Sequence, residues 1–450
     1  MRGISVSLGA GLLLMGVLAG SAHAQTSVLA QTTWGGVFTD SPTGVVVAVD
    51  GSSYVTGLTD SFTTDQFGNF IPKIFLVKFT AGGSIAWQRI WNGDTVRIGI
   101  RGPAVALDAG ALAADPSDDS IYVTGLTTSG GNDAVLLKFN ALGNLVWQRS
   151  WGGLADEESN AVATASDGSV YIAGQTFSFG ASGAGLFVVK FNSAGAMVWQ
   201  KVWDGSAGVG ALAVATDGSL YAATTAVRGP SFAFFDLIAL KITPDGALTW
   251  QRAYTAGDVA DPRGGMTVAS DGSVYIAGAL QAPKMGFVDI TALVVRLSAA
   301  GALLFDGQWA GKASETGAGI AAAPDGSVYF AGTTTSSGAG GQDSFVVHLL
   351  PSGKVGGSAT WGGAGFDEGA GVAVAADGSI RLAALAQAPP YSLLPANKRV
   401  ANVKGSLAAA TATFSDAFGT VADPADIVTT PPGSTTFAGS VDAALVRIAP

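Results

Sequence analysis

The nine residues SDGSVYIAG occur at 166–174 and again, unchanged, at 270–278, and PDGSVYFAG follows at 324–332. In each copy Asp-Gly-Ser stands between two apolar runs. This is a tight-hairpin signal, because Asp and Gly accept the backbone geometry that such turns require. A stretch that returns in this way indicates a chain built from one repeated unit.

Aligning the copies defines seven units. Each has a Trp often followed by Gly-Gly, an apolar run into the turn, an apolar run ending in a cation, and a Trp-Gln-Arg-x-Trp run. The turns are assigned to Asp50, Asp119, Asp167, Asp217, Asp271, Asp325 and Asp377, with Ser-Asp-Asp-Ser at 117–120 departing from the pattern. The cations of units 1 to 7 are Lys78, Lys138, Lys190, Lys241, Arg296, His348 and Arg447.

The intervals show how the seventh unit is completed. The next aromatic position follows the cation by 13 residues in each of the first six units, at Trp91, Trp151, Trp203, Tyr254, Trp309 and Trp361. Only three residues follow Arg447, and residues 25–34, ending at Trp34, supply the other ten. We therefore expect the N-terminal strand to complete the last unit.

Each unit offers four short β-rich runs, which we name A, B, C and D in chain order. Four-stranded repeats of this length predict an all-β fold, a seven-bladed β-propeller of four-stranded antiparallel blades. Closing the last blade with the N-terminal strand removes a free sheet edge. A parallel β-helix is the alternative, but its repeat would be shorter and would not need complementary termini.

The repeat resembles the β-propeller repeat of secreted bacterial proteins. The residues that carry the resemblance are Trp151-Gly-Gly, Asp156, Tyr171-Ile-Ala-Gly174 and Leu186-Phe-Val-Val-Lys190. The resemblance extends over essentially the whole chain after residue 24. It implies an exported or cell-surface propeller and no particular chemistry.

The N-terminal residues and the composition of the chain exclude several classes of function. Residues 1–24 carry Arg2, an apolar run and a final Ala-His-Ala, the features of a secretory signal peptide. We expect residues 25–450 to lie in the periplasm or outside the cell, as a monomer without a transmembrane segment. The formal net charge of −10 argues against nucleic acid as a partner. With no cysteine, thiol catalysis and cysteine zinc sites are excluded.

Recurring aromatic and basic residues admit a structural and a functional interpretation. The Trp pairs lie four residues apart, so along a strand they share a face and can pack between blades. Propellers that bind pyrroloquinoline quinone also repeat a Trp, but we predict packing and no cofactor. The cations could form an anion site, although their presence in every unit favours a structural role. His348 is the sole histidine after residue 24, so a Ser-His-Asp triad or multi-histidine metal site is not expected.

Acidic residues follow the aromatic position by five to seven residues, in the connection from D to the next A. They are Asp40, Asp156, Glu157, Asp261, Glu315, Asp367 and Glu368. Such a ring could hold a metal ion or a polar ligand, or its members could cap backbone N–H groups. Both interpretations stay open, with Asp40, Asp156 and Asp367 as candidate contacts and no metal assigned.

Two connections are longer than the repeat requires. The connection around residues 92–110 carries about ten extra residues, and residues 387–440 form an insertion between B and C of unit 7. Connections from B to C and from D to A lie at one end of a meander, so we expect both on one face, over blades 7, 1 and 2. Within the insertion, residues 406–418 are predicted to form a short helix.

The insertion is interpreted as a lid over the central channel or as a binding surface. Its candidate contacts are Tyr391, Lys398, Arg399 and Lys404, joined by Arg97 and Arg101 from the long connection of unit 2. Five of these six are basic in an acidic protein. They make this sector the leading candidate for partner binding.

Our leading hypothesis is an exported, non-enzymatic binding or scaffold module at the cell envelope or outside the cell. Its partner, a protein or a cell-envelope polysaccharide, would contact the loop face of blades 7, 1 and 2, and no catalytic residue is assigned. The alternative is a propeller enzyme. It would be a quinone-cofactor dehydrogenase, or a polysaccharide hydrolase or lyase using carboxylates such as Asp156 and Asp367.

Overall fold

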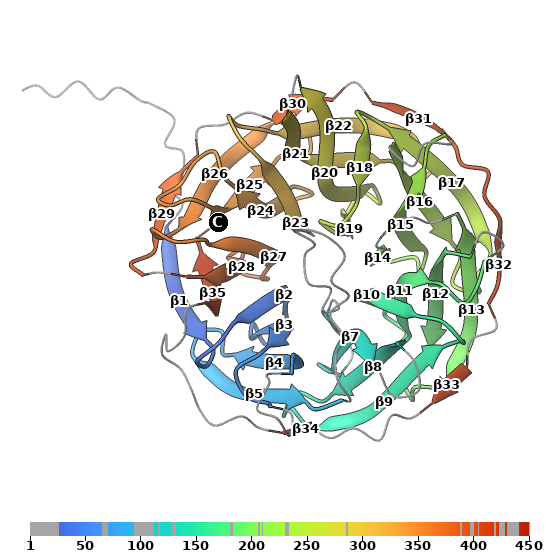
Figure 1. Ribbon diagram of the computed structural model, residues 1–450, viewed down its shortest axis with the longest axis horizontal. Helices are drawn as coiled ribbons and strands as arrows, with labels where there is room; N and C mark the ends of the chain where they lie inside the picture. The colour runs from blue at the N-terminus through green and yellow to red at the C-terminus, as the bar shows by residue number, and fades with distance from the viewer. Residues whose placement is uncertain are drawn as a thin grey trace, which may run out of the picture.

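The computed structural model shows an all-β protein whose sheets surround a central axis (Figure 1). It describes residues 27–64, 71–93, 112–115, 118–127, 132–180, 183–205, 208, 210–229, 234–284, 287–387, 389–396, 400–403, 405–417, 420–422, 428–429 and 441–449. The candidate contacts Arg97, Arg101, Lys398, Arg399 and Lys404 lie outside these residues.

Units 1 to 3 each fold into a four-stranded antiparallel meander that runs from the centre outward (Figure 1). Unit 1 contains β2 (Asp40–Val47), β3 (Ser53–Thr59), β4 (Lys73–Phe79) and β5 (Ile85–Trp91). Unit 2 contains β6 (Leu112–Ala114), β7 (Ile121–Thr127), β8 (Asp133–Phe139) and β9 (Leu145–Gly152). Unit 3 contains β10 (Glu157–Thr164), β11 (Val170–Thr176), β12 (Gly185–Phe191) and β13 (Met197–Asp204).

Units 4 and 5 belong to one hydrogen-bonded sheet. Unit 4 contains β14 (Ala211–Val214), β15 (Leu220–Val227), β16 (Phe235–Ile242) and β17 (Leu248–Thr255). In unit 5 the innermost position is divided between β18 (Val259–Asp261) and β19 (Met266–Val268), followed by β20 (Val274–Lys284), β21 (Phe287–Leu297) and β22 (Leu303–Trp309). The sheets merge because β18 pairs with both β16 and β20.

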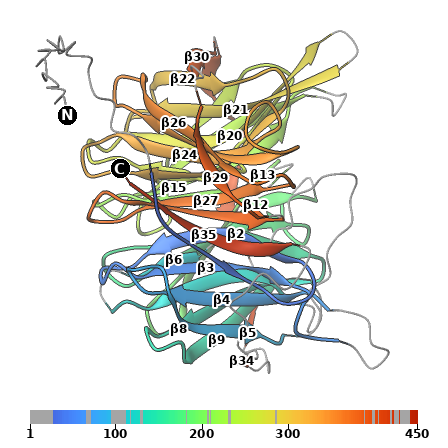
Figure 2. The ribbon, with the colours of Figure 1, turned by 90° about the vertical axis from the view of Figure 1, so that its left-hand side faces the viewer.

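Units 6 and 7 complete the circuit, and unit 7 joins the two ends of the chain. Unit 6 contains β23 (Glu315–Ala322), β24 (Val328–Thr334), β25 (Asp343–Leu349) and β26 (Val355–Gly362). Unit 7 contains β27 (Glu368–Val374), β28 (Ile380–Ala386), β35 (Asp442–Ile448) and β1 (Val28–Trp34). β1 runs antiparallel to β35, with Thr32 opposite Leu445, so the N-terminal strand is the outer strand of unit 7 (Figure 2).

The core lies between the sheets. Seven clusters of buried apolar side chains are each shared by two neighbouring units. One of them packs Trp34 of unit 7 against Phe75 of unit 1, with ring centroids 4.4 Å apart. The predicted packing of the second Trp of each pair agrees with this arrangement, because these rings are at most 2% exposed.

The final aromatic residue of most outer strands donates a hydrogen bond to the next outer strand. The acceptor lies three residues before the aromatic position of that strand, and it is a Gln in five of the six bonds. The bonds run from Trp34 to Gln88, Trp91 to Gln148 (2.9 Å), Trp151 to Gln200 (2.6 Å), Trp203 to Gln251 (2.6 Å) and Trp361 to Gln31 (3.3 Å), and Tyr254 donates to Asp306 (3.0 Å). Two of these bonds include the N-terminal strand.

Within the described residues, the insertion supplies a fifth strand to six units. We call these six segments the belt strands, since they follow the rim of the molecule (Figure 1). They are β29 (Ser392–Pro395) on β26, β30 (Val400–Asn402) on β22, β31 (Ser406–Ala409) on β17, β32 (Phe414–Asp416) on β13, β33 (Thr420–Ala422) on β9 and β34 (Val428–Thr429) on β5. All six pairings are antiparallel.

This arrangement corrects two expectations. The predicted helix at 406–418 is wrong, because its described residues form β31 and β32. The described part of the insertion is also no lid and does not gather over units 7, 1 and 2. It visits the outer edges of units 6, 5, 4, 3, 2 and 1 in turn, where open D strands offer hydrogen-bonding groups that a helix would leave unpaired.

The Asp-Gly-Ser turns follow one geometry except in unit 2. In unit 3 the Asp167 carboxylate accepts the Ser169 N–H at 2.9 Å while Gly168 takes a φ of 78°. In unit 2 the turn aspartate is Asp118 rather than Asp119, because Asp118 accepts the Ser120 N–H at 2.9 Å. Asp119 occupies the glycine place with a φ of 54°, a conformation that costs a side chain about 1 kcal/mol.

We expect Asp119→Gly to raise the free energy of unfolding by about 1 kcal/mol, because glycine adopts the left-handed conformation without that cost. The reciprocal change, Gly168→Asp in unit 3, should lower it by a similar amount. Denaturant unfolding of both variants measures the effect. A destabilised Asp119→Gly protein would contradict the assignment of this turn.

Candidate functional site

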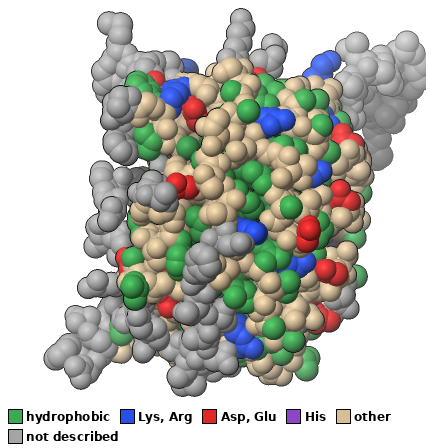
Figure 3. All heavy atoms as spheres, turned by 90° about the vertical axis from the view of Figure 1, so that its right-hand side faces the viewer, with side chains coloured by type: hydrophobic (Ala, Val, Ile, Leu, Met, Phe, Trp, Pro, Cys, Tyr) green, Lys and Arg blue, Asp and Glu red, His purple; other side chains and the backbone are tan. Residues whose placement is uncertain are grey.

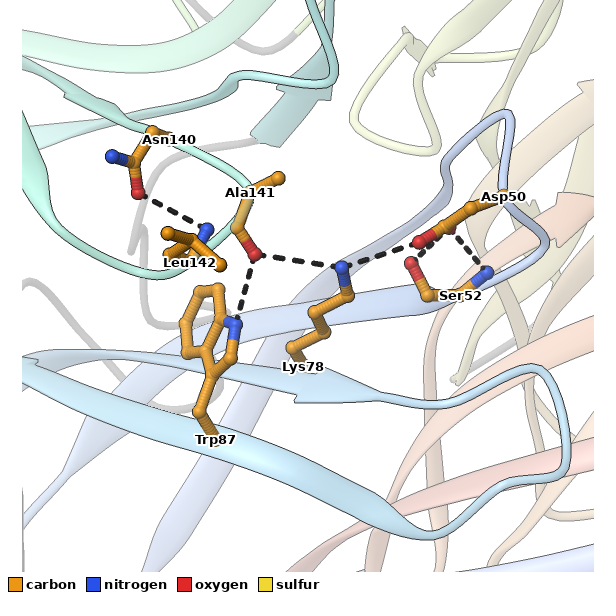
Figure 4. Close-up of polar contacts among 7 residues, drawn as sticks. All are labelled: Asp50, Ser52, Lys78, Trp87, Asn140, Ala141 and Leu142. Atoms are coloured by element: carbon orange, nitrogen blue, oxygen red, sulfur yellow. Dashed lines mark hydrogen bonds and ion pairs between the residues drawn. The ribbon is translucent and has the colours of Figure 1, made fainter.

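The cations of the C strands bind carboxylates and carbonyl groups of the fold. Lys78 lies 3.3 Å from the turn carboxylate of Asp50 and donates to the Ala141 carbonyl of unit 2, which also accepts the Trp87 indole N–H at 3.1 Å (Figure 4). Four further cations lie 2.6 to 4.0 Å from their own turn aspartates: Lys138, Lys190, Arg296 and Arg447. These contacts are those that the structural interpretation of the cations predicts.

His348 occupies the same place in unit 6 with different chemistry. Its ring stacks on Tyr329 with centroids 4.5 Å apart, and Nε2 lies 2.9 Å from the Ser327 hydroxyl. Burial lowers the pKa of His348 from its ordinary value of 6.5, against the opposing attraction of Asp325. Burial therefore favours the neutral form of this imidazole.

Four acidic residues of the D-to-A connections are buried and cap backbone N–H groups. Asp40, Glu157, Glu315 and Asp367 are fully buried. Each accepts the N–H of a glycine four residues earlier, at 2.7 to 2.8 Å: Gly36, Gly153, Gly311 and Gly363. Asp156 is exposed, and its neighbour Glu157 takes the buried place.

A second buried carboxylate explains three of the Trp-Gly-Gly motifs. The strands β35, β8 and β25 begin with Asp442, Asp133 and Asp343. A Cβ on Gly362 would lie 2.1 Å from Asp343 Oδ1 and 3.0 Å from Asp367 Oδ2, so a side chain cannot be placed between the two carboxylates. The same convergence occurs at Gly35 and Gly152.

Two of these strand-initial carboxylates, Asp133 and Asp343, hold protons more tightly than isolated ones. Burial raises the pKa of Asp133 and Asp343, and the neighbouring Glu157 or Asp367 adds to the rise. Among the residues that the structure places, no three His, Cys, Asp or Glu side chains group in a way that could hold a metal ion. Asp40, Glu157, Glu315 and Asp367 cap backbone N–H groups at the ends of the sheets.

A groove of ≈ 380 Å³ lies on the rim between units 6 and 7. It is lined by Gln31, Thr32, Thr33, Trp361, Pro389, Pro390, Tyr391 and Ala444. The ring of Tyr391 stacks on Trp361 with centroids 4.9 Å apart. Burial, then the nearby carboxylates of Asp367 and Asp442, raises the pKa of Tyr391 above its usual range. Tyr391 is the one insertion residue named from the sequence that lies within the described part of the chain.

The loop face, formed by the B-to-C and D-to-A connections, exposes large apolar side chains. They are Val37, Phe38, Leu154, Phe177, Phe234 and Phe366. We call the opposite face, formed by the A-to-B and C-to-D turns, the hairpin face. In its described turns, the exposed large apolar side chains are Val49 and Leu142. The sequence reasoning missed this set because single apolar residues in loops carry no periodic signal.

Comparison with known proteins identifies the class of repeat. Residues 323–363, which include β24 to β26 of unit 6, match the family model "Domain of unknown function (DUF5122) beta-propeller". The match supports the β-propeller repeat family. No curated protein matches the chain.

Three solved structures are similar in fold. A puromycin hydrolase mutant complexed with PGG has a TM-score of 0.48 and 14% identity over 83% of this chain, which spans 54% of that chain. The Dos1 propeller has a TM-score of 0.40 and 9% identity, covering 83% of this chain and 95% of that one. An ulvan lyase, described as a new family of polysaccharide lyase, has a TM-score of 0.41 and 9% identity, covering 82% and 94%.

The environment of His348 predicts a pH dependence of stability. Its pKa is lower in the folded chain than in the unfolded chain, so the unfolded state takes up the proton first as the pH falls. The stability that this residue contributes is therefore present above pH 6.5 and is lost as the pH falls through the folded pKa.

Between pH 7.5 and pH 5, we expect the melting temperature of the His348→Gln variant to fall by less than that of the parent protein. Thermal unfolding of both proteins at the two pH values measures the difference. An equal or larger loss in the variant would show that His348 is not held neutral by burial.

Proposed function

We propose that this chain is a seven-bladed β-propeller that acts as an exported, non-enzymatic binding or scaffold module. In this proposal the seven units are the blades, and β1 closes the last of them. The partner is a protein or a cell-envelope polysaccharide, contacted through the loop face around blades 7 and 1. Export rests on the signal-like residues 1–24, which lie outside the described part of the chain.

The observation that carries the proposal is the apolar character of the loop face. Val37 is 61% exposed in the connection from unit 7 to unit 1, and Phe366 is 56% exposed in the connection from unit 6 to unit 7. Rigid sheets hold both connections, and Phe38 lies beside Val37. Large apolar side chains left exposed on one face of a fold are typical of interaction surfaces.

Charge supports a partner other than nucleic acid. The chain has a formal net charge of −10, and Figure 3 shows basic and acidic side chains interspersed on the side of units 3 and 4. None of the described residues forms a helix with the length and hydrophobicity needed to cross a membrane.

The alternative is a propeller enzyme, since one fold hosts many activities. The polysaccharide-acting form of that alternative used Asp156 and Asp367 as a carboxylate pair. Asp156 precedes β10 of unit 3, and Asp367 precedes β27 of unit 7 on another part of the ring (Figure 1). Asp367 is also fully buried and accepts backbone N–H groups from Gly363 and Gln387, which argues against its use as a catalytic partner of Asp156.

We expect the triple variant Val37→Ser, Phe38→Ser and Phe366→Ser to bind the partner at least about tenfold more weakly, because it removes apolar contact area from the loop face. The partner is first captured from the cell envelope or culture medium with the parent protein, and its affinity for each variant is then measured.

The matched control is the hairpin-face double variant Val49→Ser and Leu142→Ser, which should bind like the parent. Equal loss in the control, or no loss in the triple variant, would contradict a loop-face contact. Turnover of a polysaccharide, or a bound quinone chromophore, would favour the enzyme.

A further inference from the structure

The outer edge of β1 differs from the other outer edges of the ring. Six outer strands each pair with a belt strand, whereas among the described residues β1 pairs with β35 alone. An outer edge without a partner offers its N–H and C=O groups to another extended strand. The place beside β1 is therefore one that an extended segment can fill.

The belt strands meet the outer strands at a constant spacing of seven residues. In each pairing one belt residue stands opposite the final aromatic residue of the outer strand. These belt residues are Leu393, Val400, Leu407, Phe414, Val421 and Val428. The next step of seven leads to Thr435, and the step after it to Asp442, the first residue of β35.

A backbone hydrogen bond to the outer strand also recurs. It is made by the residue three positions after Leu393, Val400, Leu407 and Phe414. Ala396, Val403, Ala410 and Ala417 donate their N–H groups to the carbonyls of Ser358, Asp306, Gln251 and Gln200. Each of these carbonyls belongs to the residue three before the final aromatic residue of its outer strand. Ala396 and Ala417 are buried there. In unit 7 the equivalent acceptor residue is Gln31.

The rim groove between units 6 and 7 lies beside Gln31, the equivalent acceptor residue of unit 7. Gln31, Thr32 and Thr33 of β1 line it, together with Trp361 and Tyr391. It is large enough for small side chains of an extended segment, and β1 forms one wall. The groove and the outer edge of β1 therefore adjoin each other and form a single docking site.

The sequence around Thr435, the next position in the seven-residue spacing, is similar to that of the belt strand β31 and the residues beside it. Gly433-Ser-Thr-Thr-Phe-Ala438 matches Gly405-Ser-Leu-Ala-Ala-Ala410 at its first, second and last residues. The first of these segments lies outside the described residues. Its last residue, Ala438, stands three after Thr435, as Ala410 stands three after Leu407.

We propose that residues 433–438 dock on β1 as a further belt strand, with Thr435 opposite Trp34 and the Ala438 N–H bound to the Gln31 carbonyl. The chain from Val428 to Asp442 spans two steps of seven, which is the length that one more unit requires. The occupant is thus a segment of this chain rather than a second copy or a foreign peptide.

This docking gives the N-terminal strand a second partner. β1 would be held between β35 on one side and the belt on the other, as each of the other outer strands is held between its C strand and the belt. The inference is independent of the proposed function, because it concerns the rim and not the loop face.

Disulfide trapping tests the proposal directly, because the chain has no cysteine of its own. The belt register places Thr436 opposite Thr33, as Ala408 stands opposite Ala253 in unit 4. We expect Thr33→Cys with Thr436→Cys to form an intramolecular disulfide as readily as the reference pair Ala253→Cys with Ala408→Cys. Non-reducing electrophoresis and peptide mass analysis of the oxidised full chain measure the yield.

The control is Thr33→Cys with Thr435→Cys. Adjacent strand residues point to opposite faces, so this pair should cross-link at least about tenfold less. Failure of the Thr436 pair while the reference pair forms overturns the proposal, and so does an equal yield in the control. Disulfide-linked dimers through Thr33 would assign the place to a second copy. Matching melting temperatures of the reduced variants and the parent establish that each protein is folded.

Discussion

The hydrogen bond from the final aromatic residue of one outer strand to the next outer strand is the contact on which the ring depends. A buried indole packs a large apolar surface between two sheets, but its N–H must find an acceptor, or burial costs about 1 to 3 kcal/mol. The Gln of the following unit is that acceptor in five places. The same two residue types thus fill the space between sheets and fix how one sheet meets the next.

This contact also explains why the ends of the chain meet. Gln31 accepts from Trp361, and Trp34 donates to Gln88, so β1 supplies both halves of the contact for unit 7. Pairing with β35 then makes β1 an outer strand like the others. The ring is closed by the repeat's own chemistry, with no separate device at the junction.

A closed ring of meanders still leaves its outer strands with free edges. The belt strands cover six of these edges, and their spacing of seven residues matches the distance from one outer strand to the next. An exposed row of strand edges is a template for association between molecules. Covering the edges with a segment of the same chain keeps the rim free of such templates, while the loop connections remain open to solvent.

The repeat made most of the sheet architecture predictable, because each Trp, turn and cation interacts within its unit or with the next one. Asp119 was misassigned because the sequence Ser-Asp-Asp-Ser offers two aspartates, and only hydrogen bonding to Ser120 distinguishes them. Asp156 was chosen over Glu157 for a similar reason.

The insertion was beyond local reasoning, since each of its short strands is paired with a different unit far away in the chain. A run such as Ser406–Ala409 reads as helix former when its neighbours are ignored. The spacing of Leu393, Val400 and Leu407 was visible in the sequence, but its meaning depends on knowing the width of one unit at the rim.

A double-mutant cycle on Trp34 and Gln88 tests most directly whether the N-terminal strand closes the ring through the repeated contact. The variants Trp34→Phe and Gln88→Leu, alone and combined, are unfolded in denaturant beside the matched cycle of Trp151→Phe and Gln200→Leu. The account predicts a coupling energy of about 1 kcal/mol or more in both cycles. Coupling at Trp151 and Gln200 together with none at Trp34 and Gln88 would contradict closure by the N-terminal strand.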